Sequence, residues 1–168
     1  MQTLTHHIIS SGLANRVLRD SQLARLLEGS PQRRYSLVNR ALKAGELVQL
    51  LRGRYVLAQS LREYPAHPFA LAQAFLPGSY VSFESSLAHA GWIPEAVRTV
   101  ASVTPARKSY SYEHPLFGSF SFHPLAIHPG FFLALVGREQ HNGQTMLVAQ
   151  PCRALIDLIC LRMAHGFF

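Results

Sequence analysis

The sequence is poor in cysteine, the residue from which disulfide frameworks are built. Only two of its 168 residues are cysteine, Cys152 and Cys160. Their spacing is close to two helical turns, so both side chains would fall on one stripe of a helix. Free cysteines are usually buried, and disulfides are rare in reducing compartments. We therefore expect two buried thiols in a cytoplasmic protein.

Long apolar runs are also missing. Residues 64–83 and 114–137 contain no Asp, Glu, Lys or Arg, but Pro and Gly interrupt both segments. A membrane-spanning helix needs roughly 20 consecutive, predominantly apolar residues. The N-terminus shows no basic segment followed by an apolar one, as a secretory signal would. The sequence therefore predicts a soluble protein that does not bind or cross a membrane.

The common catalytic motifs are absent as well. There is no phosphate-binding Gly-x-x-x-x-Gly-Lys, no dinucleotide Gly-x-Gly-x-x-Gly and no Gly-x-Ser-x-Gly elbow. Ser82, Ser85, Ser86 and His89 could supply a nucleophile and a base, but helix capping and helix surface are the simpler interpretation. We expect no catalytic residues and no enzymatic activity.

Nine histidines raise the question of a metal site. His114, His123 and His128 are each followed by proline, and their spacing is irregular. Neither cysteine has a second ligand at the close spacing typical of zinc sites. We interpret these histidines as loop residues at strand ends, and expect neither a metal nor another cofactor.

Positive charge is concentrated in the first third of the chain. Residues 1–64 carry ten Arg or Lys against four Asp or Glu, whereas residues 65–168 carry six against five. The net charge of +7 therefore comes almost entirely from the N-terminal part. A cluster of this kind favours binding to a polyanion such as nucleic acid.

Three helices are expected in this basic part. The first covers Leu4–Leu13, and the second covers Gln22–Glu28 with Asp20 or Ser21 as its cap. The third begins at Ser30-Pro31, where serine can cap and proline suits the first helical position, and ends at Gly45.

The third helix has two chemically different faces. Tyr35, Val38 and Leu42 share the apolar side. The other side gathers the candidate DNA-binding residues of this helix: Gln32, Arg33, Ser36, Asn39, Arg40 and Lys43. No acidic residue occurs between Pro31 and Gly45. Since an ordinary solvated face mixes charges of both signs, this pattern favours a DNA-contacting face.

A β-hairpin is expected directly after this helix. Residues 47–51 and 55–57 are apolar and flank Arg52-Gly53-Arg54, where glycine can adopt the positive φ of a tight turn. Arg52 and Arg54 would stand at the hairpin tip, in reach of phosphate. The order of elements predicts that residues 1–62 form a winged helix-turn-helix, with the third helix in the major groove.

Residues 63–168 are expected to form a small mixed α+β domain with a mostly antiparallel sheet, so that the whole chain is α+β. Its predicted helices are 68–76, 82–90 and 151–164, and its predicted strands 97–104, 109–112, 119–122, 131–136 and 145–149. Asn142-Gly143 predicts the turn before the last strand. Serines alternate with aromatics in two strands, which suits a half-buried strand better than a base-stacking sheet.

The final predicted helix carries a continuous apolar stripe. Its members are Cys152, Leu155, Ile156, Ile159, Cys160 and Met163. We expect this stripe to pack inside. Leu158 and Leu161 fall on the other side of the helix, which predicts a second cover there, such as a protein partner.

Four segments, which make up three motifs, resemble the AbiEi-type antitoxins of type IV toxin–antitoxin systems. Residues 42–47 and 52–57 resemble the helix end and the wing of the N-terminal winged helix of that family. Residues 80–91 are similar to the start of its second domain. Residues 148–157 resemble a later motif, with Arg153 at a lysine position.

The resemblance implies an antitoxin that is also the DNA-binding autorepressor of its own operon. The implied partners are operator DNA and a co-encoded nucleotidyltransferase-like toxin. Relatives usually continue beyond the last motif, so the resemblance also predicts a second domain shortened at its C-terminus. The alternative is a winged-helix transcription regulator without a toxin, whose second domain dimerises or senses a small ligand. An enzyme that uses the second domain is the third and least favoured hypothesis.

Overall fold

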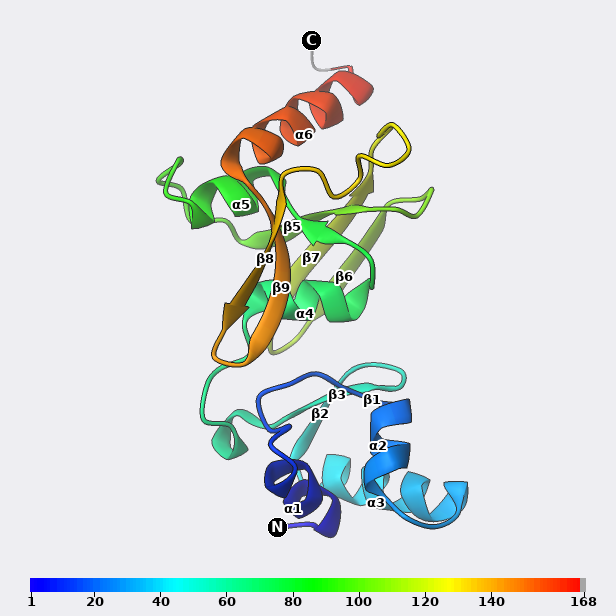
Figure 1. Ribbon diagram of the computed structural model, residues 1–168. Coiled ribbons are helices and arrows are strands. Elements are labelled where there is room, and N and C mark those ends of the chain that lie inside the picture. The colour runs from blue at the N-terminus through cyan, green and yellow to red at the C-terminus, as the bar shows by residue number, and fades with distance from the viewer. Residues whose placement is uncertain (167–168) are drawn as a thin grey trace. The chain divides into compact units, whose positions relative to one another are not determined.

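The computed structural model describes residues 1–166 as two compact units (Figure 1). The first consists of residues 1–67 and 142–144, and the second of residues 68–141 and the described residues from Thr145 onward. The expected α+β class is confirmed, with six α-helices among residues 1–166 and two sheets whose strand pairs are mostly antiparallel. No helix within residues 1–166 combines the length and apolarity needed to cross a bilayer.

The first unit contains three helices and a small antiparallel sheet. Its elements are α1 (Thr3–Ser10), β1 (Leu18–Arg19), α2 (Asp20–Leu26), α3 (Pro31–Lys43), β2 (Leu47–Leu51), β3 (Arg54–Leu57) and the 3₁₀ turn η1 (Gln59–Leu61). The strand order is β1-β3-β2, with β3 antiparallel to both neighbours. The hairpin over residues 47–57 is confirmed. The two-residue strand β1 was not predicted, because it is too short to show alternation.

One apolar core joins the three helices to the sheet. Its buried members are Leu4, Ile8, Leu18, Leu23, Leu27, Leu37, Val38, Ala41, Leu47, Tyr55 and Leu57. Glu46, just before β2, fixes the start of α1, because its carboxylate accepts from the Gln2 amide at 2.8 Å and the Thr5 hydroxyl at 2.6 Å. These hydrogen bonds, the one from Thr5 foremost, hold the pKa of Glu46 below its ordinary value.

Helix α2 begins earlier than predicted. It starts at Asp20, so the expected cap at Asp20 or Ser21 is wrong and Arg19 occupies the N-cap position. The Arg19 amide donates to the side-chain oxygen of Gln22 at 2.9 Å, which satisfies a backbone group at the helix start. The rule behind the predicted start applies to residues whose side chains accept from helix amides. Here the bond runs the other way, because the backbone amide of Arg19 donates to a side chain inside the helix.

The second unit is a six-stranded sheet with three helices. Its elements are α4 (Pro68–Phe75), β4 (Tyr80–Val81), α5 (Phe83–His89), β5 (Thr99–Thr104), β6 (Tyr110–His114), β7 (Gly118–Pro124), β8 (Val136–His141), β9 (Gln144–Ala149) and α6 (Pro151–Ala164). The strand order is β6-β7-β5-β4-β9-β8. Two pairs, β5 with β7 and β4 with β9, are parallel. Asn142 and Gly143 have positive φ angles of 48° and 73°, as their predicted turn requires.

Helices pack against both faces of this sheet. Phe120 of β7 contacts Phe75 of α4, with ring centroids 4.6 Å apart, whereas His123 of the same strand contacts Phe83 of α5 at 5.6 Å. Even and odd positions of a strand point to opposite faces, so α4 and α5 lie on opposite sides of β7. Phe120 and Phe122 are fully buried, which confirms core packing for β7, whereas Tyr110 of β6, the other alternating strand, is exposed.

The predicted strand at residues 131–136 is wrong. Residues 131–135 form turns, and β8 begins only at Val136. The backbone carbonyls of Phe131, Phe132 and Ala134 accept hydrogen bonds from the Arg153 guanidinium instead of from a neighbouring strand. The apolar run predicts a buried strand, but the guanidinium of Arg153, distant in the sequence, satisfies the backbone carbonyls of this segment.

Candidate nucleic-acid interface

Helix α3 begins and ends as its sequence predicts. The Ser30 hydroxyl accepts from the Arg33 amide at 3.3 Å, Pro31 occupies the first helical position, and the helix ends at Lys43. Gly45 follows with φ of +69° and nothing within 4 Å of where a Cβ would stand. The limits of α3 are therefore set by local side-chain and backbone chemistry.

The buried face of α3 differs from the predicted one. Leu37, Val38 and Ala41 are buried, whereas Leu42 is only half-buried and Tyr35 is 65% exposed. The prediction grouped Tyr35 with Val38 and Leu42, which placed the apolar centre about a quarter of a turn from the observed one. Tyr35 instead stands at the surface, at the edge of the cationic face.

The cationic face itself is open to solvent. Gln32, Arg33, Arg40 and Lys43 are exposed, and Ser36 and Asn39 are half-buried. Within residues 1–166, no carboxylate lies within salt-bridge distance of these three cations. The Ser36 hydroxyl donates to the Gln32 carbonyl at 3.0 Å, so it is already engaged with its own helix. The face thus carries positive charge that the protein does not neutralise.

The hairpin turn presents one of its two arginines more openly than the other. Arg52 is exposed, whereas Arg54 is half-buried as the first residue of β3, opposite Arg19 of β1. Gly53 between them has φ of +75°, and its carbonyl accepts from the Asp20 amide at 3.1 Å. Asp20 therefore fixes the turn that carries Arg52.

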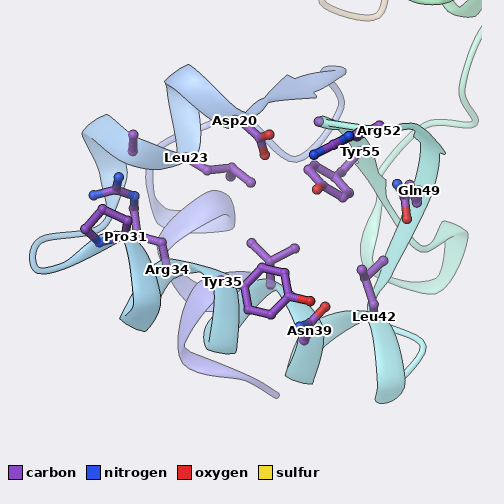
Figure 2. Close-up of a pocket in the computed structure, with 13 residues that line it drawn as sticks. Asp20, Leu23, Pro31, Arg34, Tyr35, Asn39, Leu42, Gln49, Arg52 and Tyr55 are labelled. Atoms are coloured by element: carbon purple, nitrogen blue, oxygen red, sulfur yellow. The ribbon is translucent and has the colours of Figure 1, made fainter.

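A cavity of about 520 Å³ separates α3 from the hairpin. Figure 2 shows Tyr35 and Asn39 of α3 on one side and Gln49, Arg52 and Tyr55 of the hairpin on the other. Asp20 lies at its edge. Burial, together with the Asp20 carboxylate, raises the pKa of the Tyr55 phenol above its ordinary value. The cavity is open, with a mixed polar and apolar lining, and Arg34 of α3 and Arg52 of the hairpin border it.

The serines proposed above as an alternative catalytic group are held in structural hydrogen bonds. Ser85 Oγ donates to the Thr99 carbonyl and accepts from the Ala101 amide, and Ser86 Oγ donates to the Ala149 carbonyl. Ser82 does not cap α5 through its side chain, contrary to the prediction, because its hydroxyl donates to Asp157 at 2.7 Å. His89 points elsewhere, to Glu139 at 3.0 Å.

The motif residues of the second unit form a buried polar network. Asp157 accepts from Arg153 Nε at 2.8 Å, from the Tyr80 hydroxyl at 3.0 Å and from Ser82. All four side chains are at least nine-tenths buried. Burial, followed by the Asp157 carboxylate, raises the pKa of Tyr80. A buried ion pair this well satisfied joins α6 to β4 and to the loop at 131–134.

The two faces of α6 are reversed relative to the prediction. Leu158 and Leu161, the predicted partner-binding residues, are partly buried and pack against the core of the second unit. Cys152 and Cys160 are exposed, so the expected buried thiols are wrong. The helix turns Arg153, Ala154 and Asp157 inward, because the buried pair has to reach Tyr80 and the loop. The apolar stripe is therefore left outside.

Among residues 1–166, no three His, Cys, Asp or Glu side chains gather closely enough to hold a metal ion. His123 is half-buried in β7, and burial lowers its pKa.

No protein-family model and no curated protein matches the chain.

Proposed function

We propose that the first unit is a winged helix that binds duplex DNA, with α3 in the major groove and the β2–β3 hairpin as the wing. The observation that carries this proposal is the exposed face of α3, whose Arg33, Arg40 and Lys43 have no carboxylate partner in the described chain. A helix of this size fits the major groove, and its uncompensated charge attracts phosphate.

Each polar residue has an assigned part in this proposal. Arg33 and Arg40 contact guanine edges or phosphate, and Lys43 contacts phosphate. Gln32, Ser36 and Asn39 supply hydrogen bonds next to them. On the wing, Arg52 reaches the adjacent backbone, and Arg54, which is half-buried, contributes less.

We further propose that the protein is an antitoxin and the autorepressor of a type IV toxin–antitoxin operon. This step is supported by the order of the three AbiEi-like motifs along the chain. The alternative, a winged-helix regulator without a toxin, differs in one respect that can be observed directly. An antitoxin gene requires a neighbouring reading frame for a nucleotidyltransferase-like protein, whereas the alternative does not.

A gel-shift titration against the region upstream of its own gene tests the DNA-binding proposal. We expect the full chain to bind this duplex more tightly than an unrelated one, and Arg40→Ala to weaken specific binding by about 1–3 kcal/mol if Arg40 pairs with a guanine edge. Arg138→Ala is the matched control, because Arg138 is an exposed arginine of β8 in the other unit. Equal losses for the two variants would contradict the proposal.

A further inference from the structure

A continuous apolar stripe covers the outer side of α6. Four of its members, Leu155, Ile156, Ile159 and Met163, are 43%, 53%, 43% and 63% exposed. Cys152 and Cys160 complete the stripe and are also exposed. A row of six uncharged side chains on a folded surface is typical of a protein–protein contact.

The charged residues of α6 stand outside this stripe. Arg153 and Asp157 face the interior and neutralise each other. Arg162 lies beside the stripe and reaches Glu84 of α5 at 3.6 Å. Nothing within the stripe would therefore repel an identical surface or select a charged partner.

We propose that the α6 stripe binds the same stripe of a second copy of this chain, with the two helices antiparallel about a two-fold axis. In this register Ile156 lies level with Ile159 of the other copy, and Cys152 lies level with Met163. Leu155 and Cys160 flank the stripe on opposite edges, each on the same side as its own counterpart in the other copy. All six residues then meet members of the same set, as an isologous interface requires.

The antiparallel direction follows from charge. Two parallel copies would bring both Arg162 side chains to the same end of the helix pair, together with both C-terminal dipole ends. Antiparallel helices instead place each C-terminal end beside the N-terminal end of the other copy, which is favourable. The proposed register therefore separates the two Arg162 residues.

The available area suits a stable dimer. Arg153 holds the loop at 131–134 against the first turn of α6, and Phe131, Leu133 and Leu135 in and after this loop are each more than half exposed. They add exposed apolar side chains next to the first turn of α6, toward the roughly 800 Å² that each partner contributes to a standard-size interface. This inference does not depend on the proposed DNA binding.

Sedimentation equilibrium of the full chain tests the dimer. We expect wild type to be dimeric and Ile156→Glu with Ile159→Glu to weaken self-association by roughly ten-thousandfold, about tenfold for each of the four isoleucines that the two chains lose. Since both isoleucines are half exposed, circular dichroism should show an unchanged fold. Thermal stability should fall only by the concentration-dependent part that dimerisation contributes. Leu116→Glu, at a turn residue 69% exposed, is the matched control and should remain dimeric. A monomeric wild type overturns the proposal, even if its stripe binds a different protein. A double variant that is still dimeric overturns it as well.

Disulfide cross-linking tests the register, and uses variants that keep the stripe apolar. In a background with Cys152→Ala and Cys160→Ala, Ile156→Cys and Ile159→Cys chains are prepared separately, one with a mass tag, and mixed under mild oxidation. We expect the mixed cross-link to form faster than either cross-link between identical chains. Faster linking of identical chains, or no linking above that of Leu116→Cys in the same background, overturns the proposed arrangement.

Discussion

At the scale of single residues, Gly53 determines whether the hairpin can carry Arg52 in its observed position. Its φ of +75° is accessible to glycine but strained for other residues. A Cβ at this position would stand 2.7 Å from Asp20 Oδ2. The turn therefore depends on glycine both for its backbone conformation and for the close approach of α2.

Gly53→Ala is accordingly expected to destabilise the first unit more than Gly45→Ala. Both glycines have a positive φ, but a Cβ at Gly45 would meet nothing within 4 Å. The backbone strain common to both changes is about 1–2 kcal/mol, so the excess loss for Gly53→Ala measures the contact with Asp20. Urea unfolding of the two variants gives the comparison. Equal losses would mean that Asp20 simply moves aside.

Asp157 has the corresponding role in the second unit. Asp157→Asn leaves the Arg153 guanidinium buried without its counter-ion, and we expect a loss of about 3–5 kcal/mol in the free energy of unfolding. The control is Arg162→Gln, which breaks an ion pair that is about half exposed and should cost at most about 1 kcal/mol. Chemical denaturation distinguishes the two. A loss for Asp157→Asn as small as the control's would contradict a structural role for the network.

At the scale of elements, α3 and α6 show how far a helical pattern determines which face is buried. The predicted bounds of both helices agree with the observed ones within a residue or two, and for α3 Ser30-Pro31 and Gly45 mark the ends. On α3 the polar face was predicted correctly, since Arg33, Arg40 and Lys43 have no reason to be inside. On α6 the more apolar face is outside. The sequence could not show this, because the pairing of Arg153 and Asp157 with Tyr80 spans more than seventy residues.

The contact between α1 and the start of β2 gives a pH-dependent prediction for the first unit. The fold lowers the pKa of Glu46 below its ordinary value of 4.5, mainly through the Thr5 hydroxyl and then the Gln2 amide. The ionised Glu46 carboxylate therefore contributes its full stabilisation of the fold above about pH 4.5. This contribution disappears as the pH falls through the lower pKa that Glu46 has in the folded protein. We expect wild type to be more stable than Glu46→Gln at neutral pH and to lose this advantage progressively in acid. Denaturant unfolding at a series of pH values measures it, and a constant difference would contradict the assignment.

At the scale of the whole molecule, the two units differ in charge, as the sequence already shows. Nearly all of the excess positive charge lies in the first unit, which holds both the cationic face of α3 and the arginines of the hairpin. The short strands β1 and β4 and the loop at 131–135 could not be predicted, because tertiary hydrogen bonds rather than local pattern decide them. What separates an antitoxin from a simpler repressor lies outside this chain, in its gene neighbour.

The most direct test of the central claim is the salt dependence of duplex DNA binding by the full chain, measured for wild type and Lys43→Ala. If the cations of α3 and the wing neutralise about four to six phosphates, log affinity should fall against log salt concentration with a slope of roughly −4 to −5. Lys43→Ala should reduce this slope by about one. A slope near zero, or one that Lys43→Ala leaves unchanged, would contradict binding through this face.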